Sequence, residues 1–329
     1  MQVVDRETST ALHVALASAT QSTHGPQQDR SPSFAHQIDV CVCSYKRNEI
    51  ISTLAALSRQ EGLEGFHMRV VVADNTADGE MRGVIAKAAA DYALDLAYIS
   101  APADNISVAR NACLENVQAD WVAFLDDDEV PTPGWLRALV DEAKRGAWDA
   151  VLGPVKAVYG NQTPRWIRQG DFNSTGPVWV HGKICTAYTG NIIFRRDFAE
   201  RLGLRFRLEL GKCGGEDEEF FSRFFDAGGR IGFSRDAVVF EPVQSERATM
   251  RWLLKRSFRS GQSYGGRLSQ KTKRHGLEIA RAFGKVAVCL LGAVLCSPRR
   301  LSRNRFLVRG ALHLGVVTRL MGLREINIY

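Results

Sequence analysis

Apolar runs of strand length alternate with amphipathic segments from residue 38 to residue 125. Four β-rich apolar runs predict strands, at residues 38–45, 69–73, 94–99 and 121–125. Three segments between them have apolar residues at helical spacing and predict helices, at about 49–60, 78–91 and 106–117. Strands that alternate with helices of this length are joined by right-handed crossovers and form a parallel sheet. The pattern therefore predicts an α/β fold whose sheet carries helices on both faces.

The second half of the chain is less regular. Further strands are predicted at residues 150–159, 187–194 and 230–240. Residues 161–182 contain turn-forming Pro and Gly together with Trp166 and Trp179, and long irregular segments of this kind are usually functional. We interpret this segment as the surface that selects an acceptor. Four acids at 216–219 follow two glycines and precede four phenylalanines, which predicts a helix with an acidic first turn and a core-facing aromatic stripe.

Polar residues follow the predicted strands of the first half. Tyr45 follows the first strand, Asp74 the second, and the four acids of residues 126–129 the last. Because parallel strands end at the same edge of a sheet, we expect these residues to converge on one crevice. Asp126 and Asp128 can face one ion, and their hard oxygen donors suit Mg²⁺ or Mn²⁺ rather than zinc or copper. The alternative is an acidic turn before the helix that begins near residue 133.

Composition places the chain among globular proteins. Of 329 residues, 45% are apolar and 24% are charged, which excludes wholesale disorder and fibrous repeats. The seven cysteines form no C-x-x-C pair, which indicates reduced thiols in a cytoplasmic setting. Residues 1–36 are rich in Ser, Thr, Gln and Ala and predict a disordered extension.

The net charge of +7 hides a strongly basic tail. Residues 247–324 contain eighteen Lys and Arg against one acid, Glu278. This excess indicates a negatively charged partner, and an anionic membrane face fits better than nucleic acid because the tail is apolar and carries no nucleic-acid-binding motif. The apolar runs at 283–296 and 306–323 predict amphipathic helices that lie in the membrane interface and do not cross it. The alternative is that these helices cap the core or mediate dimerisation.

The ordered set of landmarks resembles the family-2 inverting glycosyltransferases of the GT-A fold. The matching stretches are residues 43–49, 72–75, 109–111, 125–129, 189–191 and 215–218. The chain looks most like bacterial glucosyltransferases that extend lipid-linked repeats of succinoglycan-type exopolysaccharides. The resemblance covers about residues 38–260 and implies a Rossmann-like, mostly parallel sheet. Together with the composition of the two ends, it divides the chain into three regions. These are an extension at 1–36, a GT-A domain at 37–260, and a basic helical membrane-associating region at 261–329. The GT-A domain divides into a nucleotide-binding half at 37–130 and an acceptor half at 131–260.

The resemblance also implies roles for individual residues. Asp217 takes the place of the catalytic base; neighbouring acids would raise its pKa, whereas the helix N-terminus would lower it. The donor-binding residues would be Ser44, Tyr45, Arg47, Asp74, Arg110, Asp126 and Asp127. The acceptor-binding residues would be Gly190, Asn191, Glu216 and Trp179. Asp126 and Asp128 would bind Mg²⁺ or Mn²⁺. Many relatives add a histidine ligand where this chain has Glu241, so either Glu241 is an oxygen ligand or fewer protein groups hold the metal.

We therefore expect a metal-dependent, inverting hexosyltransferase that moves glucose from a UDP-linked donor to a hydroxyl of a lipid-linked oligosaccharide. We expect it at the inner face of the cytoplasmic membrane as a peripheral protein, without a nucleic-acid partner. A metal would stabilise charge on the leaving diphosphate, and a carboxylate would take the proton of the acceptor hydroxyl. The alternatives are a haloacid-dehalogenase-type phosphatase with Asp126 as nucleophile, a metal-dependent nucleotidyltransferase, or a non-catalytic scaffold. A dehydrogenase is disfavoured because no G-x-G-x-x-G follows a strand.

Overall fold

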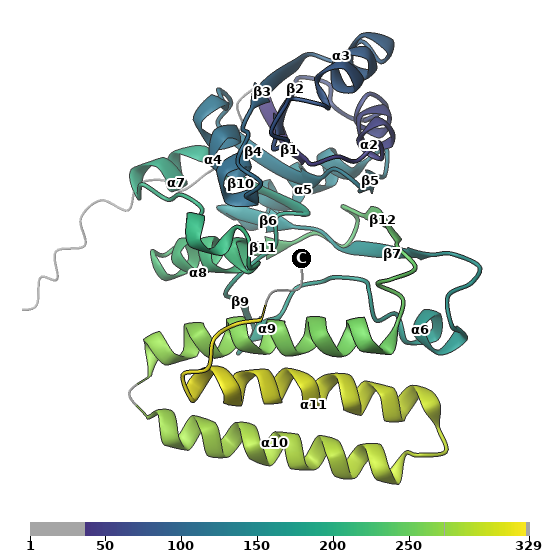
Figure 1. Cartoon of the computed structure of the whole chain (residues 1–329). Coiled ribbons are helices and arrows are strands. Elements are labelled where there is room, and N and C mark those ends of the chain that lie inside the picture. Colours follow the sequence, from purple (N-terminus) through teal and green to yellow (C-terminus); the bar gives the residue numbers. More distant parts are fainter. Residues whose placement is uncertain (1–36, 273, 327–329) are drawn as a thin grey trace, which may run out of the picture. The chain divides into compact units, whose positions relative to one another are not determined.

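The structure, a computed structural model, describes residues 37–272 and 274–326. The extension predicted at residues 1–36 lies outside the described residues. A seven-stranded sheet forms the centre of the fold (Figure 1). Its strand order is β11 (Ile231–Phe233), β6 (Ala150–Leu152), β10 (Asn191–Arg195), β4 (Trp121–Asp126), β1 (Gln37–Ser44), β2 (His67–Asp74) and β3 (Leu96–Ser100). Only β10 runs antiparallel to its neighbours, so the mostly parallel sheet is confirmed.

Both faces of this sheet are buried, as its apolar strands predict. Along β1, Ile38, Val40 and Val42 face one side, and Cys41 faces the other. The first side is covered by α2 (Ile50–Leu57), α3 (Arg82–Asp91) and α5 (Trp135–Gly146). The second is covered by α4 (Ile106–Asn116) and α8 (Glu216–Asp226), with the short α7 (Arg196–Arg201) and η1 (Leu208–Leu210) between them in the chain. The predicted α/β architecture, with helices on both faces of the sheet, is therefore present.

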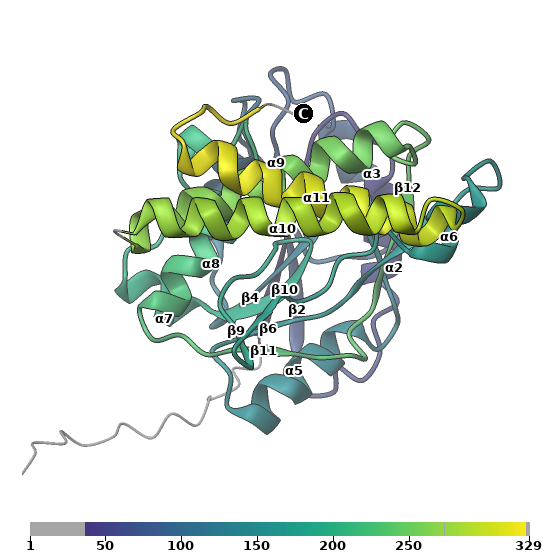
Figure 2. The same cartoon turned by 90° about the horizontal axis from the view of Figure 1, so that it is seen from below.

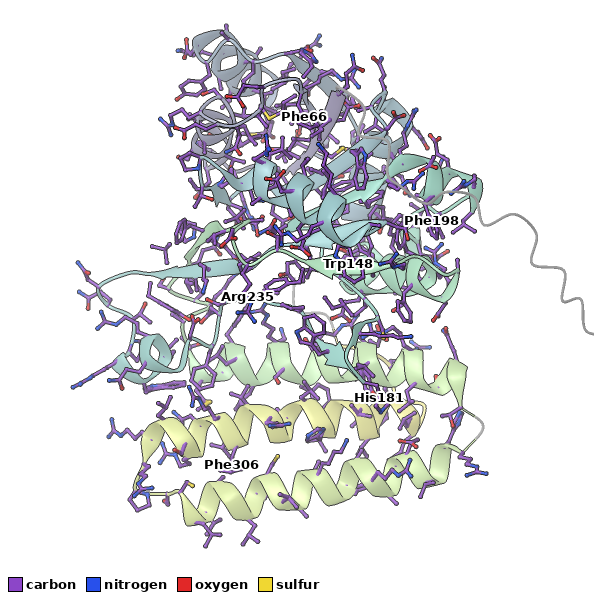
Figure 3. All side chains as sticks on the ribbon, turned by 180° about the vertical axis from the view of Figure 1, so that it is seen from behind. Phe66, Trp148, His181, Phe198, Arg235 and Phe306 are labelled. Atoms are coloured by element: carbon purple, nitrogen blue, oxygen red, sulfur yellow. The ribbon has the colours of Figure 1, made fainter. Side chains whose placement is uncertain are left out.

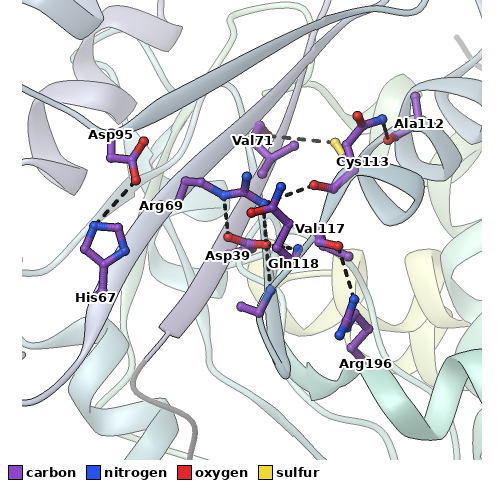
Figure 4. Close-up of polar contacts among 12 residues, drawn as sticks. Asp39, His67, Arg69, Val71, Asp95, Ala112, Cys113, Val117, Gln118 and Arg196 are labelled. Atoms are coloured by element: carbon purple, nitrogen blue, oxygen red, sulfur yellow. Dashed lines mark hydrogen bonds and ion pairs between the residues drawn. The ribbon is translucent and has the colours of Figure 1, made fainter.

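A buried carboxylate, Asp39, connects the start of β1 to neighbouring segments of the sheet. Asp39 is 2% exposed and accepts hydrogen bonds from Arg69 Nε at 2.8 Å and Arg69 Nη2 at 2.7 Å (Figure 4). The backbone N–H groups of Gln118 and Ala119 donate to the same carboxylate. Burial alone would raise the pKa of Asp39, but the hydrogen bonds from Arg69 and the two N–H groups lower it below its ordinary value. The ionised carboxylate thus links β1, β2 and the start of β4 at the edge opposite the predicted site.

Two segments predicted as single strands are each divided between two sheets. Residues 150–159 form β6 in the large sheet and β7 (Val155–Tyr159) in a three-stranded sheet of order β5 (Val130–Pro131), β12 (Val239–Val243), β7. The break falls at Gly153 and Pro154, where proline has no N–H for the ladder and a Cβ on Gly153 would lie 2.1 Å from the Ala237 carbonyl oxygen. Residues 230–240 likewise separate into β11 and β12. The predictions of single strands at 150–159 and 230–240 were therefore wrong.

The irregular segment at 161–182 is not entirely loop. It contains α6 (Arg165–Gly170) and β8 (Trp179–Val180), which pairs with β9 (Lys183–Ile184). His181 marks the turn of this hairpin in Figure 3, at the level of α9 (Met250–Lys271). Residues 175–178, which precede this hairpin, and residues of α9 line one cavity, described below, so that part of the segment lies close to α9.

Three long helices form a layer at the C-terminal end of the chain (Figures 1 and 2). Helix α11 (Arg300–Leu320) packs against both α9 and α10 (His275–Leu295) and lies between them. Glycines allow close approach: a Cβ on Gly315 would lie 2.0 Å from the Phe258 carbonyl oxygen, and one on Gly292 would lie 2.6 Å from the ring of Phe306 (labelled in Figure 3). Helix α9 continues through residue 260, the position at which the sequence pattern predicts the end of the GT-A domain. No helix in residues 37–272 or 274–326 combines the length and apolar character that crossing a bilayer requires.

Candidate active site

The carboxyl ends of β1, β2 and β4 bring the residues predicted from strand ends to one edge of the sheet. In the strand register, Ser44 pairs with Asp74 and Cys43 with Asp126. The backbone N–H of Tyr45 donates to Asp127 Oδ2 at 3.1 Å. Residues separated by about 80 positions in the sequence therefore meet because the parallel strands end together.

Arg47 lies against the acidic cluster that follows β4. Its Nη1 is 3.2 Å from Asp127 Oδ1 and 2.6 Å from Asp128 Oδ2. Burial raises the pKa of Asp127 to about 7 in spite of the charge of Arg47. Burial and the neighbouring Asp126 also raise the pKa of Asp128. One guanidinium therefore does not balance the negative charge of this cluster, which leaves an attraction for a further cation.

Glu241 faces the same cluster from β12. Burial raises the pKa of Glu241 to about 7, and the carboxylates of Asp128 and Asp126 add to the rise. Arg247 Nη1 lies 3.3 Å from Glu241 Oε1. Among the described residues, no three carboxylate, His or Cys side chains are already arranged around a point that would hold a metal ion. The donor set of Asp126, Asp128 and Glu241 nevertheless fits Mg²⁺ or Mn²⁺ chemically, because all three are carboxylate oxygen ligands, although Asp128 is paired with Arg47 and Glu241 with Arg247.

Glu129 is a buried member of the acidic cluster and contacts the backbone of Asp126. It was not among the predicted site residues. Its side chain is buried, and Oε2 accepts a hydrogen bond from the Asp126 N–H at 3.0 Å. A Cβ on Gly190 would lie 2.5 Å from Glu129 Oε1 and 3.2 Å from Asp126 Oδ2. Gly190, predicted to bind the acceptor, is thus the residue whose lack of a side chain leaves room for these two carboxylates. The sequence signal for Glu129 was present, since it is the fourth of four consecutive acids.

Arg110 joins the two sides of the site. Its side chain is 7% exposed and forms an ion pair with Glu216, which is equally buried. Arg110 Nη2 also lies 3.7 Å from Asp126 Oδ1. The predicted donor-binding Arg110 and the predicted acceptor-binding Glu216 therefore contact each other. The second carboxylate oxygen of Glu216, Oε2, is buried and has no hydrogen-bond partner.

Asp217 follows Glu216 in the first turn of α8. The helix is held in the core by Phe220, Phe221 and Phe224, and the ring of Phe220 stacks on that of Phe206 at 4.3 Å. Gly215 precedes the helix with a φ of +88°, a conformation that favours glycine. Burial raises the pKa of Asp217 to about 7, Glu216 adds to the rise, and Arg110 opposes it. A carboxylate with a raised pKa is suited to accept a proton near neutral pH.

Asp217 lines a cavity of about 230 Å³ between α8, α9 and the β8–β9 region. The cavity is lined by residues 175–178, 186–188, 213–215, 217 and 218, and by Arg256, Arg259, Ser260 and Ser263 of α9. Trp179, predicted to bind the acceptor, is exposed and directly follows the lining residue Val178. Sequence reasoning missed the α9 residues, although their spacing of three and four positions was a readable signal of one helix face.

Two predicted contact residues have side chains that are already occupied. Asp74 is fully buried and accepts hydrogen bonds from Thr76 N–H at 3.0 Å, Thr76 Oγ1 at 2.7 Å and the Tyr98 hydroxyl at 2.8 Å. Asn191 accepts from Trp135 Nε1 at 2.7 Å and donates to the carbonyls of Pro154 and Ala237. These contacts make Asn191 a link between β10, α5 and the loops before β7 and β12, so we leave it out of the acceptor site proposed below. In contrast, Ser44 Oγ is buried at the same sheet edge without a hydrogen-bond partner.

Comparison with known proteins identifies the family. Residues 39–203 match the family model "Glycosyl transferase family 2". The chain belongs to glycosyltransferase family 2. This family-2 glycosyltransferase is 47% identical over 302 residues to the succinoglycan biosynthesis protein ExoM of Rhizobium meliloti (strain 1021). The aligned region covers 91% of this chain and 97% of that protein. It is 28% identical to a glucosyl-dolichyl phosphate glucuronosyltransferase of Haloferax volcanii over 48% of this chain and 54% of that protein.

Solved structures agree with this assignment at the level of the fold. The chain is similar to S. aureus TarS 1–349 crystallised with UDP-GlcNAc, with a TM-score of 0.51 and 18% identity, over 87% of this chain and 92% of that one. The family and fold of this family-2 glycosyltransferase confirm the resemblance drawn from its motifs. They do not favour a phosphatase or a nucleotidyltransferase.

Proposed function

We propose that this family-2 glycosyltransferase transfers a hexose, glucose, from a UDP-linked donor to a hydroxyl of a lipid-linked oligosaccharide in exopolysaccharide synthesis. The name of the 47% identical succinoglycan biosynthesis protein supports the pathway class. The UDP-GlcNAc bound by a protein of the same fold supports a UDP-linked donor. The observation that carries the proposal is the two-sided crevice, in which Arg110 connects the donor-side Asp126 to the Glu216–Asp217 pair beside the cavity.

On the donor side, the acidic cluster and the sheet edge would hold the nucleotide and its diphosphate. Asp126, Asp128 and Glu241 would hold Mg²⁺ or Mn²⁺, which supplies positive charge for the diphosphate as it leaves. Tyr45 is 40% exposed at the same edge and would contact the nucleoside. Arg47, paired with Asp127 and Asp128, would exchange part of that pairing for contact with the diphosphate oxygens.

On the acceptor side, Asp217 would accept the proton of the attacking hydroxyl. The attack on the anomeric carbon from the face opposite the diphosphate would invert its configuration in one displacement. The cavity beside Asp217 offers hydroxyl and guanidinium groups from Ser260, Ser263 and Arg256 for hydrogen bonds to a glycan. The basic tail would keep the enzyme at the inner face of an anionic membrane, where a lipid-linked acceptor is found.

The test is transfer of radiolabelled sugar from a panel of nucleotide sugars to a lipid-linked oligosaccharide fraction, with Mg²⁺ or Mn²⁺ present. Asp217→Asn is expected to lower kcat by at least about 100-fold and leave donor binding within roughly threefold, because it removes the base and keeps the shape. Asp120→Asn is the matched control, since Asp120 is exposed at the opposite end of β4. Equal rates for wild type and Asp217→Asn would refute the role of Asp217, and release of pyrophosphate instead of nucleoside diphosphate would refute sugar transfer.

A further inference from the structure

Helix α10 is apolar around most of its circumference, yet the residues that the structure describes cover only one side of it. Ala282, Cys289 and Ala293 are buried on the side that faces α11. The opposite side, called here the outer face of α10, carries six large apolar residues that are 49% to 73% exposed. They are Phe283, Val288, Leu290, Leu291, Val294 and Leu295. Helices that are apolar all round are normally buried, so the outer face has the character of a contact surface.

The charges around the outer face indicate what covers it. Residues 286–298 contain no charged side chain, which gives an uncharged stretch about 20 Å long. Arg281 and Lys285 lie at helical positions that border the outer face, and Arg299 and Arg300 follow the helix. Glu278 is the one acid among the residues of the basic segment 247–324. A second copy of the chain would bring two such basic surfaces together, whereas an anionic bilayer offers both apolar chains and opposite charge.

The position of α10 in the helix layer leaves the active site open. Helix α9 lines the cavity beside Asp217, and α11 lies between α9 and α10 (Figures 1 and 2). A bilayer on the outer face of α10 would therefore contact the side of the layer that does not line the cavity. An amphipathic helix that lies parallel to the membrane surface buries its apolar face at the boundary of headgroups and acyl chains while its basic residues reach the headgroups.

We propose that the outer face of α10 inserts into the surface of an anionic bilayer and is the membrane-docking element of this enzyme. The inference deepens the proposed function, since it names the surface that meets the membrane carrying the acceptor. Apolar burial by Leu291, Val294 and their neighbours holds the helix in the lipid. Lys285 and Arg281, which also pairs with Glu278 at 2.6 Å, contact the acidic headgroups.

The experiment is sedimentation of the purified full chain with vesicles. Vesicles of phosphatidylcholine mixed with phosphatidylglycerol are compared with vesicles of phosphatidylcholine alone, at low and high salt. Wild type is expected to bind the anionic vesicles and to bind less at high salt. The double variant Leu291→Gln with Val294→Gln is expected to bind at least roughly tenfold more weakly, because two exposed apolar side chains no longer enter the lipid. Leu202→Gln is the control, since Leu202 is 44% exposed at the end of α7, away from this layer.

A second measurement reports insertion directly. A Val294→Trp variant is expected to show fluorescence quenching by brominated acyl chains beyond that of wild type, whereas Leu202→Trp should show no added quenching. Wild type that stays in the supernatant with anionic vesicles, or a double variant that binds as wild type does, overturns the proposal. A lipid-free dimer that the double variant abolishes would assign the outer face to a second copy and also overturns it.

Turnover without vesicles separates this inference from the proposed function. The double variant is expected to transfer sugar to a water-soluble acceptor analogue at the wild-type rate, because α10 does not line the cavity. Vesicle binding without any sugar transfer by wild type would refute the proposed function and support the docking surface. Sugar transfer without vesicle binding would support the proposed transfer reaction and refute the docking surface.

Discussion

Arg110 is the buried cation that both sides of the active site share, and replacing it tests how the site is held together. The variant Arg110→Gln leaves Glu216 as a carboxylate that is 7% exposed and has lost its counter-ion. An unpaired buried charge of this kind costs roughly 3–5 kcal/mol. Because typical free energies of unfolding are about 5–15 kcal/mol, the single variant should lose a large part of its stability.

Removing both charges should restore most of that loss. In the double variant Arg110→Gln with Glu216→Gln, two neutral amides replace the ion pair, and no unpaired charge stays buried. We expect a coupling energy of at least about 2 kcal/mol between the two substitutions. Urea unfolding followed by tryptophan fluorescence measures it. The control is Arg137→Gln, because the pair of Arg137 with Asp141 is exposed and should be worth less than about 1 kcal/mol.

The same variants should move the pH dependence of activity in opposite directions. Asp217 must be deprotonated to act as a base, so kcat/KM rises with pH through its pKa of about 7. Glu216 raises the pKa of Asp217 and Arg110 lowers it. Glu216→Gln should therefore shift the acidic limb of the profile to lower pH, and Arg110→Gln should shift it to higher pH. Donor KM should change less than about tenfold, since the 3.7 Å pair of Arg110 with Asp126 is partly exposed.

Two results would refute this reasoning about the Arg110–Glu216 pair. One is additive loss of stability in the double variant, within about 0.5 kcal/mol. The other is a shift of both single variants in the same direction of pH.

Three further predictions follow from other parts of the molecule. Chelation of divalent cations should abolish transfer, with recovery on adding Mg²⁺ or Mn²⁺; undiminished turnover in chelator would remove the metal from the proposal. Asp39→Asn should lower the free energy of unfolding by about 3 kcal/mol at neutral pH. The pKa of Asp39 is lowered in the folded state, so that stabilisation is present above its unfolded pKa of about 4 and is lost as pH falls through the folded value. The difference between the variant and wild type in urea unfolding should therefore vanish in acid. Gly315→Ala should lower Tm, because its Cβ would lie 2.0 Å from the Phe258 carbonyl oxygen, whereas Gly284→Ala meets nothing within 4 Å and should be neutral or slightly stabilising.

The parallel half of the fold was predictable because its pattern is local. Apolar runs of strand length such as Trp121–Asp126 alternate with helical stripes such as Ile50–Leu57, and both faces of such a sheet must be buried. The strand ends then place Tyr45, Asp74 and Asp126 at one edge without any knowledge of their contacts. The second half was less predictable, because the break at Gly153 and Pro154 depends on which sheet each piece joins, and that is a long-range choice.

Within the site, the available chemical groups can be read from the sequence, whereas folding sets which of them act on each other. The four acids after β4 and the Glu216–Asp217 pair can be identified in the amino-acid sequence. That Arg110 pairs with Glu216, 106 positions away, is not, because no periodicity relates residues that only folding brings together. The same holds for the part of α9 that lines the cavity and for the side of α10 that stays uncovered. The sequence predicts a helix over the apolar run at 283–296. Which face of that helix stays exposed depends on how it packs against α11.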